Sequence, residues 1–432
     1  MMRTSKLWLL VAAMLLSCGG NSSSPTGIPP ADAGPTNEIR SALTRNLAPT
    51  VDPGDASQLA ADNLAFGLAL HAQLRGQNSE NFVFSQTSIS LALAMLYGGA
   101  ANNTAAQMAS TLRFTLPPER LHPAFDALDL ALTTPPAGAG ANAFRLVIAN
   151  SIWVQTGFPF LSSYLDLLAV NYDAGLFTED FVSAPEPARA DINRWVSQQT
   201  ENMIPELFPA QSIDASTRLV LANAVYFHGI WRDGFSPVSA NGVFHAPMGD
   251  VSVPMMSNSQ NNAALWGEAG WTYASLAYNG GTTSMILLVP DAGTFDAFEQ
   301  GLTAESLASM LAPAAPMLGR LSMPRFKFST TSRLASVLKQ LGMTDAFDPG
   351  LADFSAMDGA RDLVVDEVFH QAVVAVDEQG TTAAAATGVV GSVNVVIEPG
   401  QLFVADRPFL FFIRHNPTGA ILFQGRVLDP SQ

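Results

Sequence analysis

The chain has 432 residues, of which 48% are hydrophobic and only 13% are charged, so it can bury a large core and is not disordered as a whole. Its formal net charge is −16, and the resulting field repels phosphate and sulfate, which excludes nucleic acid and heparin-like polyanions as expected partners. No interior linker or internal repeat divides the sequence, and we therefore expect one large domain.

The first residues are typical of an export signal, because Arg3 and Lys6 precede an apolar run from Leu7 to Leu16. The ending Leu15-Leu16-Ser17-Cys18 resembles the lipobox of bacterial lipoproteins, in which the cysteine is acylated after cleavage. We therefore expect a lipoprotein signal peptide over residues 1–17 and lipidation at Cys18, which would be the only link to a membrane. An ordinary signal peptide with an incidental cysteine is the alternative. Either places the protein outside the cell or in the cell envelope.

The next segment, residues 18–55, is rich in Gly, Ser, Pro, Asn and Thr. This composition buries too little apolar surface to offset chain entropy and predicts a flexible tether. From residue 56 the pattern becomes helical, with residues of one face running from Leu59 to Leu74 until Gly76. The folded domain is therefore expected to span residues 56–432, without a disulfide, since Cys18 is the only cysteine.

The rest of the chain mixes helical and strand-like segments. A second helix is expected after Ser85 and before Gly98-Gly99, and another over residues 188–199. Short β-branched and aromatic runs predict buried strands at residues 150–154, 219–227, 285–289, 364–376, 409–413 and 421–427. Because these elements do not alternate as βαβ units, the pattern predicts an α+β fold rather than a doubly wound α/β fold.

The segment after the strand-like residues 373–376 has an unusual run of small residues. After Glu378 it contains Gly380, Thr381, Thr382, Ala383, Ala384, Ala385, Ala386 and Thr387. From Gly380 to Ile397 there is neither proline nor charge, so every backbone N–H could join a sheet and no side chain resists burial. A surface loop does not need that property. Composition alone leaves two interpretations open, a flexible Ala-rich linker and a segment that can enter a central sheet.

Several segments of the sequence resemble segments of the serpin family, and they occur in the same order along the chain. The run from Glu378 to Thr387 is similar to the hinge of inhibitory serpins, and residues 403–430, with Arg407-Pro408-Phe409, are similar to the C-terminal signature. Further matches lie at residues 81–89, 193–204 and 221–231. The similarity covers about residues 56–432, and agreement of independent segments is far more specific than one short motif. It implies a serpin fold of the α+β class with three β-sheets, about eight or nine helices and an exposed reactive-centre loop.

The resemblance also implies a mechanism. Inhibitory serpins present this loop as bait, are cleaved to an acyl-enzyme, and insert the loop into the large sheet before hydrolysis completes. Counting sixteen residues onward from Glu378 places the reactive bond between Asn394 and Val395, roughly 50 Å away in an extended strand. The expected partner is a serine endopeptidase held as a covalent acyl-enzyme complex by a monomeric inhibitor. The alternatives are inhibition of a cysteine protease and a non-inhibitory serpin-fold binding protein.

The choice of protease depends on the register of this count. Loop counting selects Asn394, which would suit an asparaginyl endopeptidase, a cysteine protease. Its neighbours Val393, Val395 and Val396 would suit an elastase-like enzyme with a small apolar pocket.

By the same resemblance, two clusters control the sheet. One, the shutter, would be a buried hydrogen-bonded group beneath the separating strands, formed by Ser85, Ser88, Asn223 and His370. Trp231 and Glu378 would form the breach, where the loop first enters. A lone histidine in an apolar strand is usually a satisfied core residue, so we expect a structural role for His370. The sequence departs from the family at Gln86, where proline usually begins the helix, which predicts a looser helix start.

Enzyme signatures are weak. Ser336-Val-Leu-Lys339 matches the S-x-x-K pattern of β-lactamases, but neither K-T-G nor S-D-N accompanies it. The six histidines are far apart, and no cysteine or carboxylate cluster has the spacing of metal ligands. We therefore expect no catalytic residue, no metal and no cofactor.

Overall fold

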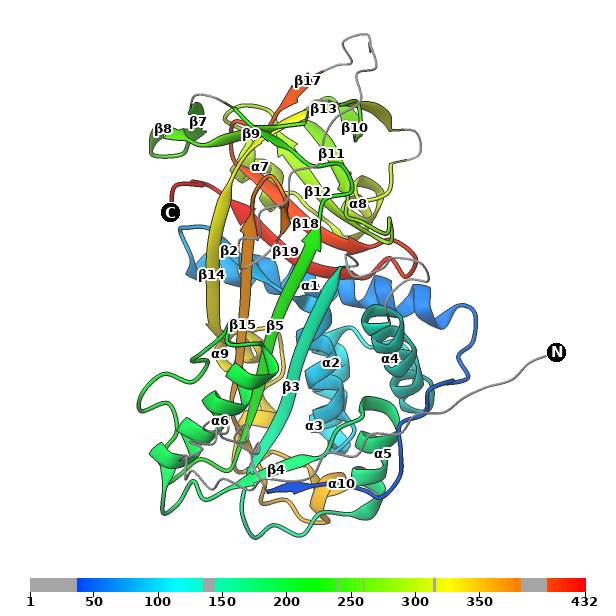
Figure 1. Cartoon of the computed structure of the whole chain (residues 1–432). Coiled ribbons are helices and arrows are strands. Elements are labelled where there is room, and N and C mark those ends of the chain that lie inside the picture. Colours follow the sequence, from blue (N-terminus) through cyan, green and yellow to red (C-terminus); the bar gives the residue numbers. More distant parts are fainter. Residues whose placement is uncertain (1–36, 135–143, 239–240, 259, 314–315, 382–401) are drawn as a thin grey trace, which may run out of the picture. The chain divides into compact units, whose positions relative to one another are not determined.

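The computed structural model describes residues 37–432 except 135–143, 239–240, 259, 314–315 and 382–401, and these residues belong to one compact unit (Figure 1). The described part contains ten α-helices and three β-sheets of seven, ten and two strands. This is the expected α+β arrangement. The helix count exceeds eight or nine because it includes short segments such as α10, with four residues. No helix among the described residues is both long and apolar enough to span a bilayer.

The helices alternate irregularly with the strands along the chain, without βαβ repetition. They are α1 (Asp55–Gln77), α2 (Gln86–Tyr97), α3 (Asn102–Leu112), α4 (Pro118–Thr133), α5 (Ser162–Tyr172), α6 (Pro185–Gln199), α7 (Phe295–Gln300), α8 (Ala304–Met310), α9 (Ala335–Gln340) and α10 (Ser355–Asp358). The expected helices after residue 56, after Ser85 and over residues 188–199 are α1, α2 and α6.

The seven-stranded sheet holds the segments most relevant to function. In spatial order its strands are β1 (Glu38–Ile39), β4 (Leu176–Glu179), β3 (Arg145–Gln155), β5 (Leu219–Ile230), β16 (Gly380–Thr381), β15 (Val365–Val376) and β14 (Phe326–Arg333). The long strands β3, β5, β15 and β14 run side by side in Figure 1.

The second sheet has ten strands. They are β2 (Phe82–Phe84), β19 (Ile421–Val427), β18 (Phe409–His415), β12 (Thr283–Pro290), β11 (Trp271–Ala277), β10 (Ala263–Glu268), β13 (Met317–Pro324), β9 (Met255–Ser257) and β6 (Ser236–Pro237), with β17 (Leu402–Val404) beside β13. The hairpin of β7 (Gly242–Ala246) and β8 (Gly249–Val253) is the two-stranded sheet.

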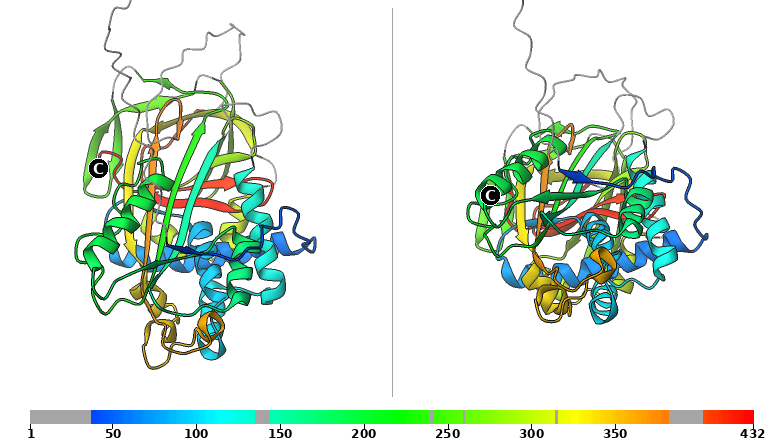
Figure 2. Two further views of the ribbon diagram at one scale, coloured as in Figure 1. Left: turned by 60° about the horizontal axis from the view of Figure 1, so that its bottom comes forward. Right: turned by 90° about the horizontal axis from the view of Figure 1, so that it is seen from below.

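Both faces of the central strand β5 are covered, which explains why most of its residues are apolar. Leu221 and Val225 of β5 pack into the cluster that contains residues of α1 and α2, whereas Ala222 and Ala224 pack into the cluster that contains Trp195 of α6. Successive side chains thus enter opposite cores, as the two-residue period of a strand requires. Figure 2 shows α6 on one face of the sheet and the first helices on the other.

The flexible tether was expected to extend to residue 55, but its last part belongs to the folded body. Residues 37–54 lie on the folded body, and α1 already begins at Asp55. β1 pairs with β4, the Asn46 N–H donates to the Val170 carbonyl at 3.0 Å, and Arg45 Nε lies 2.7 Å from Asp126 Oδ1. Composition did not predict that this segment packs on the folded body, because specific polar partners on α4 and α5, rather than apolar burial, hold it in place.

Candidate insertion site between two strands

The site lies between β5 and β15. These strands pair directly as parallel neighbours from Leu219 opposite Val365 to Tyr226 opposite Val373. Beyond that point they diverge, and β16 lies between them: Thr381 is opposite Gly229 of β5 and opposite Val376 of β15, antiparallel to both. The first residues of the predicted hinge therefore already occupy a central strand position.

Specific contacts hold β16 in this position. Thr381 is 1% exposed, and its hydroxyl shares a hydrogen bond with the Tyr278 hydroxyl at 2.5 Å. The Tyr278 ring stacks on Trp231 with centroids 4.5 Å apart. Gly380 is required by close approach, because a Cβ there would overlap the carbonyl oxygen of Gly229. The end of the gap is thus shaped for a small residue followed by a buried hydroxyl.

Trp231 and Glu378, the two residues expected at the breach, both lie beside the start of β16. Trp231 Nε1 donates to the Asp377 carbonyl at 2.8 Å, and its backbone N–H donates to the Gln379 carbonyl at 2.9 Å. Arg325 Nε lies 2.7 Å from Glu378 Oε1. These bonds connect residues 377–379 to Trp231, just after β5, and to Arg325, just before β14.

Sequence reasoning missed Tyr278 and Arg325. Tyr278 stands just before the turn signal Asn279-Gly280-Gly281, which marks a hairpin but not its neighbour in space. Arg325 lies between β13 and β14, more than fifty residues from its partner Glu378. No local sequence pattern predicts either contact.

The four predicted shutter residues also meet. Asn223 Nδ2 donates to the Ser88 hydroxyl at 2.6 Å and to the Ser88 carbonyl at 3.0 Å, and Asn223 Oδ1 accepts from His370 Nδ1. The Ser85 N–H donates to His370 Nε2 at 3.2 Å. Asn150, which sequence reasoning missed, accepts a further bond from Asn223. The cluster joins the start of α2 to both strands that flank the gap.

His370 is neutral in this cluster. It is fully buried, and burial lowers its pKa to about 3. Because a backbone N–H can only donate, Nε2 must accept from Ser85, which leaves the proton on Nδ1 for Asn223. The described structure therefore uses both ring nitrogens for hydrogen bonds within the protein.

The start of α2 differs from the expectation at Gln86. The helix begins at Gln86, and Ser85 caps it by accepting from the Ser88 N–H at 3.1 Å. The Gln86 side chain lies over Gly67 of α1, where a Cβ would clash with it. Neither amide atom of Gln86 has a hydrogen-bond partner among the described residues. The missing proline thus leaves a buried polar side chain rather than a frayed helix end.

Other predicted residues fall in different places. Cys18, Asn394, Val395, Thr382, Ala383, Ala384, Ala385, Ala386 and Thr387 lie outside the described residues. Ser336 and Lys339 are exposed on α9, and Lys339 Nζ lies 5.2 Å from the centre of the Phe347 ring. Among the residues that the structure describes, no group of three His, Cys, Asp or Glu could hold a metal ion.

Comparison with known proteins agrees with this geometry. The family model described as serpin (serine protease inhibitor) matches residues 61–430. The leukocyte elastase inhibitor of Homo sapiens is 37% identical over 384 residues, covering 86% of this chain and all of that protein.

Solved structures show the same fold. Uncleaved ovalbumin has a TM-score of 0.78 and 28% identity, over 86% of this chain and all of its own. Thyroxine-binding globulin in complex with thyroxine has a TM-score of 0.76 and 26% identity, over 86% of this chain and 99% of its own. With a family model over most of its length and relatives above 30% identity, the chain belongs to the serpin family.

Proposed function

We propose that this serpin inhibits a serine endopeptidase as a suicide substrate, by cleavage near Asn394 and insertion of the cleaved loop as an extra strand between β5 and β15. The observation that carries the proposal is the position of β16, because Thr381 already pairs with both flanking strands and Gly380 pairs with β5. Their antiparallel direction is the one that the following residues need in order to continue down the gap. Insertion then extends a ladder that has begun.

The energetics favour insertion after cleavage. Continuing β16 replaces one parallel ladder between β5 and β15 with two antiparallel ladders. If each added hydrogen bond contributes about 1 kcal/mol net, the gain is on the order of 10 kcal/mol. The uncleaved state must therefore be held kinetically. Because enzymes turn over at about 1 to 10³ per second, insertion must be comparably fast to trap the acyl-enzyme.

The target proposal rests on the residues around the bond. Val393, Val395 and Val396 flank Asn394, and the human relative at 37% identity is a leukocyte elastase inhibitor. Both support a serine endopeptidase with a small apolar pocket. A cysteine protease that cuts after asparagine is the alternative, and mass spectrometry of the cleaved loop distinguishes the two by the terminal residue.

The test is formation of a covalent adduct. Wild-type inhibitor mixed with an elastase-type endopeptidase should give an SDS-stable band at the summed mass. Thr381→Glu places a charge in the 1%-exposed position of β16, so this variant should be cleaved as a substrate with adduct yield reduced at least about tenfold. Thr331→Glu, at an exposed position of β14 in the same sheet, should retain the adduct. Cleavage without adduct in wild type and both variants would contradict the proposal.

The second candidate is a non-inhibitory serpin-fold binding protein. It is supported by likeness to thyroxine-binding globulin, a structure solved with thyroxine bound. Its loop would be cut by a non-target protease without a change in the sheet.

We further propose export and anchoring through a lipid on Cys18, supported by Leu15-Leu16-Ser17-Cys18 after an apolar run. The protein would then act as a monomer in the cell envelope or outside the cell. Metabolic labelling with a fatty acid should mark wild type but not Cys18→Ser, and label retained by Cys18→Ser would contradict acylation there.

A further inference from the structure

Two aspartates at the end of α10 face each other. Asp358 is the last residue of α10, and Gly359, whose positive φ of 86° favours glycine, ends the helix. The carboxyl group of Asp362 then lies within hydrogen-bonding reach of that of Asp358. The pair stands just before Val365, where β15 begins and where its direct pairing with β5 starts.

The carboxyl group of Asp358 is buried, and the chain satisfies only half of it. The residue is 7% exposed. Its Oδ1 accepts from the Ala360 N–H at 2.8 Å, whereas its Oδ2 has no hydrogen-bond donor among the described residues. Burying a carboxylate oxygen without a donor or a cation is costly. Oδ2 therefore needs a partner that the described part of the chain does not provide.

Asp362 does not provide that partner while it is ionised, because a carboxylate has no hydrogen to donate. Burial raises the pKa of Asp358, and the neighbouring Asp362 carboxyl raises it further. Both effects disfavour the state in which the two groups carry their negative charges. Either a proton or a cation between the carboxylates would relieve this repulsion.

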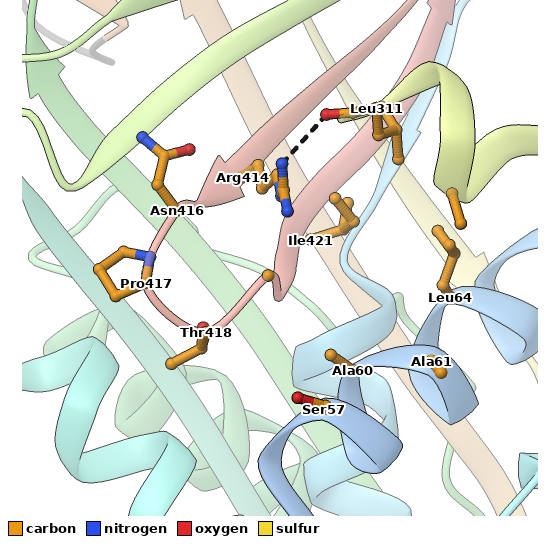
Figure 3. A pocket seen from close by; sticks show the side chains of 12 residues that line it. Ser57, Ala60, Ala61, Leu64, Leu311, Arg414, Asn416, Pro417, Thr418 and Ile421 are labelled. Atoms are coloured by element: carbon orange, nitrogen blue, oxygen red, sulfur yellow. Dashed lines mark hydrogen bonds between the residues drawn. The ribbon is translucent and has the colours of Figure 1, made fainter. Parts of the chain in front are cut away.

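No basic side chain neutralises the pair. Arg361, which is next in sequence, pairs instead with Asp353 at 2.7 Å. Arginines without a carboxylate partner lie elsewhere, and Arg414 of β18, for example, donates to the Leu311 carbonyl at 3.0 Å (Figure 3). None of the ion pairs among the described residues includes either aspartate of this pair. The missing positive charge must therefore come from solution.

We propose that Asp358 and Asp362 bind a calcium ion. Calcium takes six to eight oxygen ligands, among which carboxylates are common, so water and backbone carbonyls complete the shell. Asp362 is exposed and gives the ion and its water a path of entry. Asp358 is fixed by its bond to Ala360, and calcium tolerates such a fixed, irregular site better than magnesium, which demands a near-ideal octahedron.

The position of the site gives the ion a structural effect. Bound calcium connects the end of α10 to the residues that lead into β15, at the end of that strand opposite to the one that β16 pairs with. Because only two protein carboxylates contribute, the affinity belongs to the weak class, with a dissociation constant of about 10⁻⁴ to 10⁻³ M.

Equilibrium dialysis of the intact protein with radioactive calcium measures binding directly. The net charge of −16 attracts calcium non-specifically, so ionic strength is held constant and the variants are compared with wild type. Wild type should bind about one ion per molecule more than Asp362→Asn. Asp291→Asn makes the same charge change at an exposed position in another turn and should bind as wild type does. Equal uptake by wild type and Asp362→Asn would overturn the proposal.

Thermal melting provides a second readout and shows that each variant is folded. In a chelator, Asp362→Asn should melt no lower than wild type, because it removes the repulsion on Asp358. At about ten times the dissociation constant, calcium should raise the melting temperature of wild type by about 2 °C more than that of Asp362→Asn. Asp358→Asn keeps an oxygen for the Ala360 N–H and should lose the same gain. If the carboxylates share a proton instead, calcium will raise all melting temperatures equally, which contradicts the proposal.

Discussion

The hydroxyl of Tyr278 contacts Thr381 in β16, the short strand between β5 and β15. Its bond to Thr381 is 2.5 Å long and buried. Tyr278→Phe and Thr381→Val should each lower the free energy of unfolding by about 1 kcal/mol, because each removes the same hydrogen bond. The double variant should lose less than the sum, by about 1 kcal/mol, in a double-mutant cycle measured in urea. Strict additivity would show that the two hydroxyls do not interact.

His370 makes stability depend on pH. Its pKa is about 3 in the folded protein and about 6.5 when unfolded, so the unfolded chain binds the proton first. Its contribution is complete above pH 6.5 and is lost as the pH falls from 6.5 toward 3. Between pH 7 and pH 5 this amounts to about 2 kcal/mol. Burial lowers the pKa of His122 as well, to about 4, so His122 acts in the same direction.

Urea unfolding at both pH values tests this. His370→Asn should reduce the difference between pH 7 and pH 5 by about 2 kcal/mol. His245→Gln is the control, because His245 is exposed and its bond to Asp250 raises its pKa, the opposite sign. An unchanged difference in His370→Asn would show that this histidine is not held neutral.

The N-terminal segment of residues 37–54 forms ion pairs with residues of α4 and with Asp173, just after α5. Arg45 is 13% exposed and pairs with Asp126, which is fully buried, and with Asp129. Arg45→Gln should lower the free energy of unfolding by about 3 kcal/mol, because it leaves a buried carboxylate unpaired. Arg40→Gln is the matched control. Its partner Asp173 is 58% exposed, so urea unfolding should show a loss below about 1 kcal/mol. Equal effects would contradict a buried pair at Arg45.

Helices and strands with a strong local sequence pattern could be predicted from the sequence. Residues 219–227 and 364–376 are rich in β-branched and aromatic residues and form β5 and β15, which lie between residues of both core clusters. Glycines at 98 and 99 correctly end α2. β1 could not be predicted, since a two-residue strand has no period and depends on β4, which lies more than a hundred residues away. The contacts of Arg45 could not be predicted for the same reason, because its partner Asp126 is distant in the sequence.

Across the whole molecule, the sequence predicted which residues lie close together. It did not predict the geometry of their contacts. Resemblance brought Ser85, Ser88, Asn223 and His370 together, and the structure joins them by hydrogen bonds. The seating of Thr381 against Tyr278 depends on three segments far apart in the chain. Gln86 illustrates the same point, because its buried side chain is accommodated by a glycine on another helix. Such contacts are set by tertiary packing, which local patterns do not encode.

The proposed function requires a native fold that lies above its free-energy minimum. β5 and β15 hold the gap closed by direct pairing below β16, and the shutter cluster bridges them beneath. Cutting the loop would free one end of the segment after Thr381 and allow the remaining residues to follow β16 into the sheet. The energy released would appear as added stability of the nicked protein.

Differential scanning calorimetry of intact and nicked protein measures this directly. The loop is cut by a protease that forms no adduct, and both forms are heated under identical conditions. A gain on the order of 10 kcal/mol predicts that the melting temperature of the nicked form rises by at least about 10 °C. An unchanged or lower melting temperature after complete cleavage would contradict insertion and, with it, the trapping mechanism.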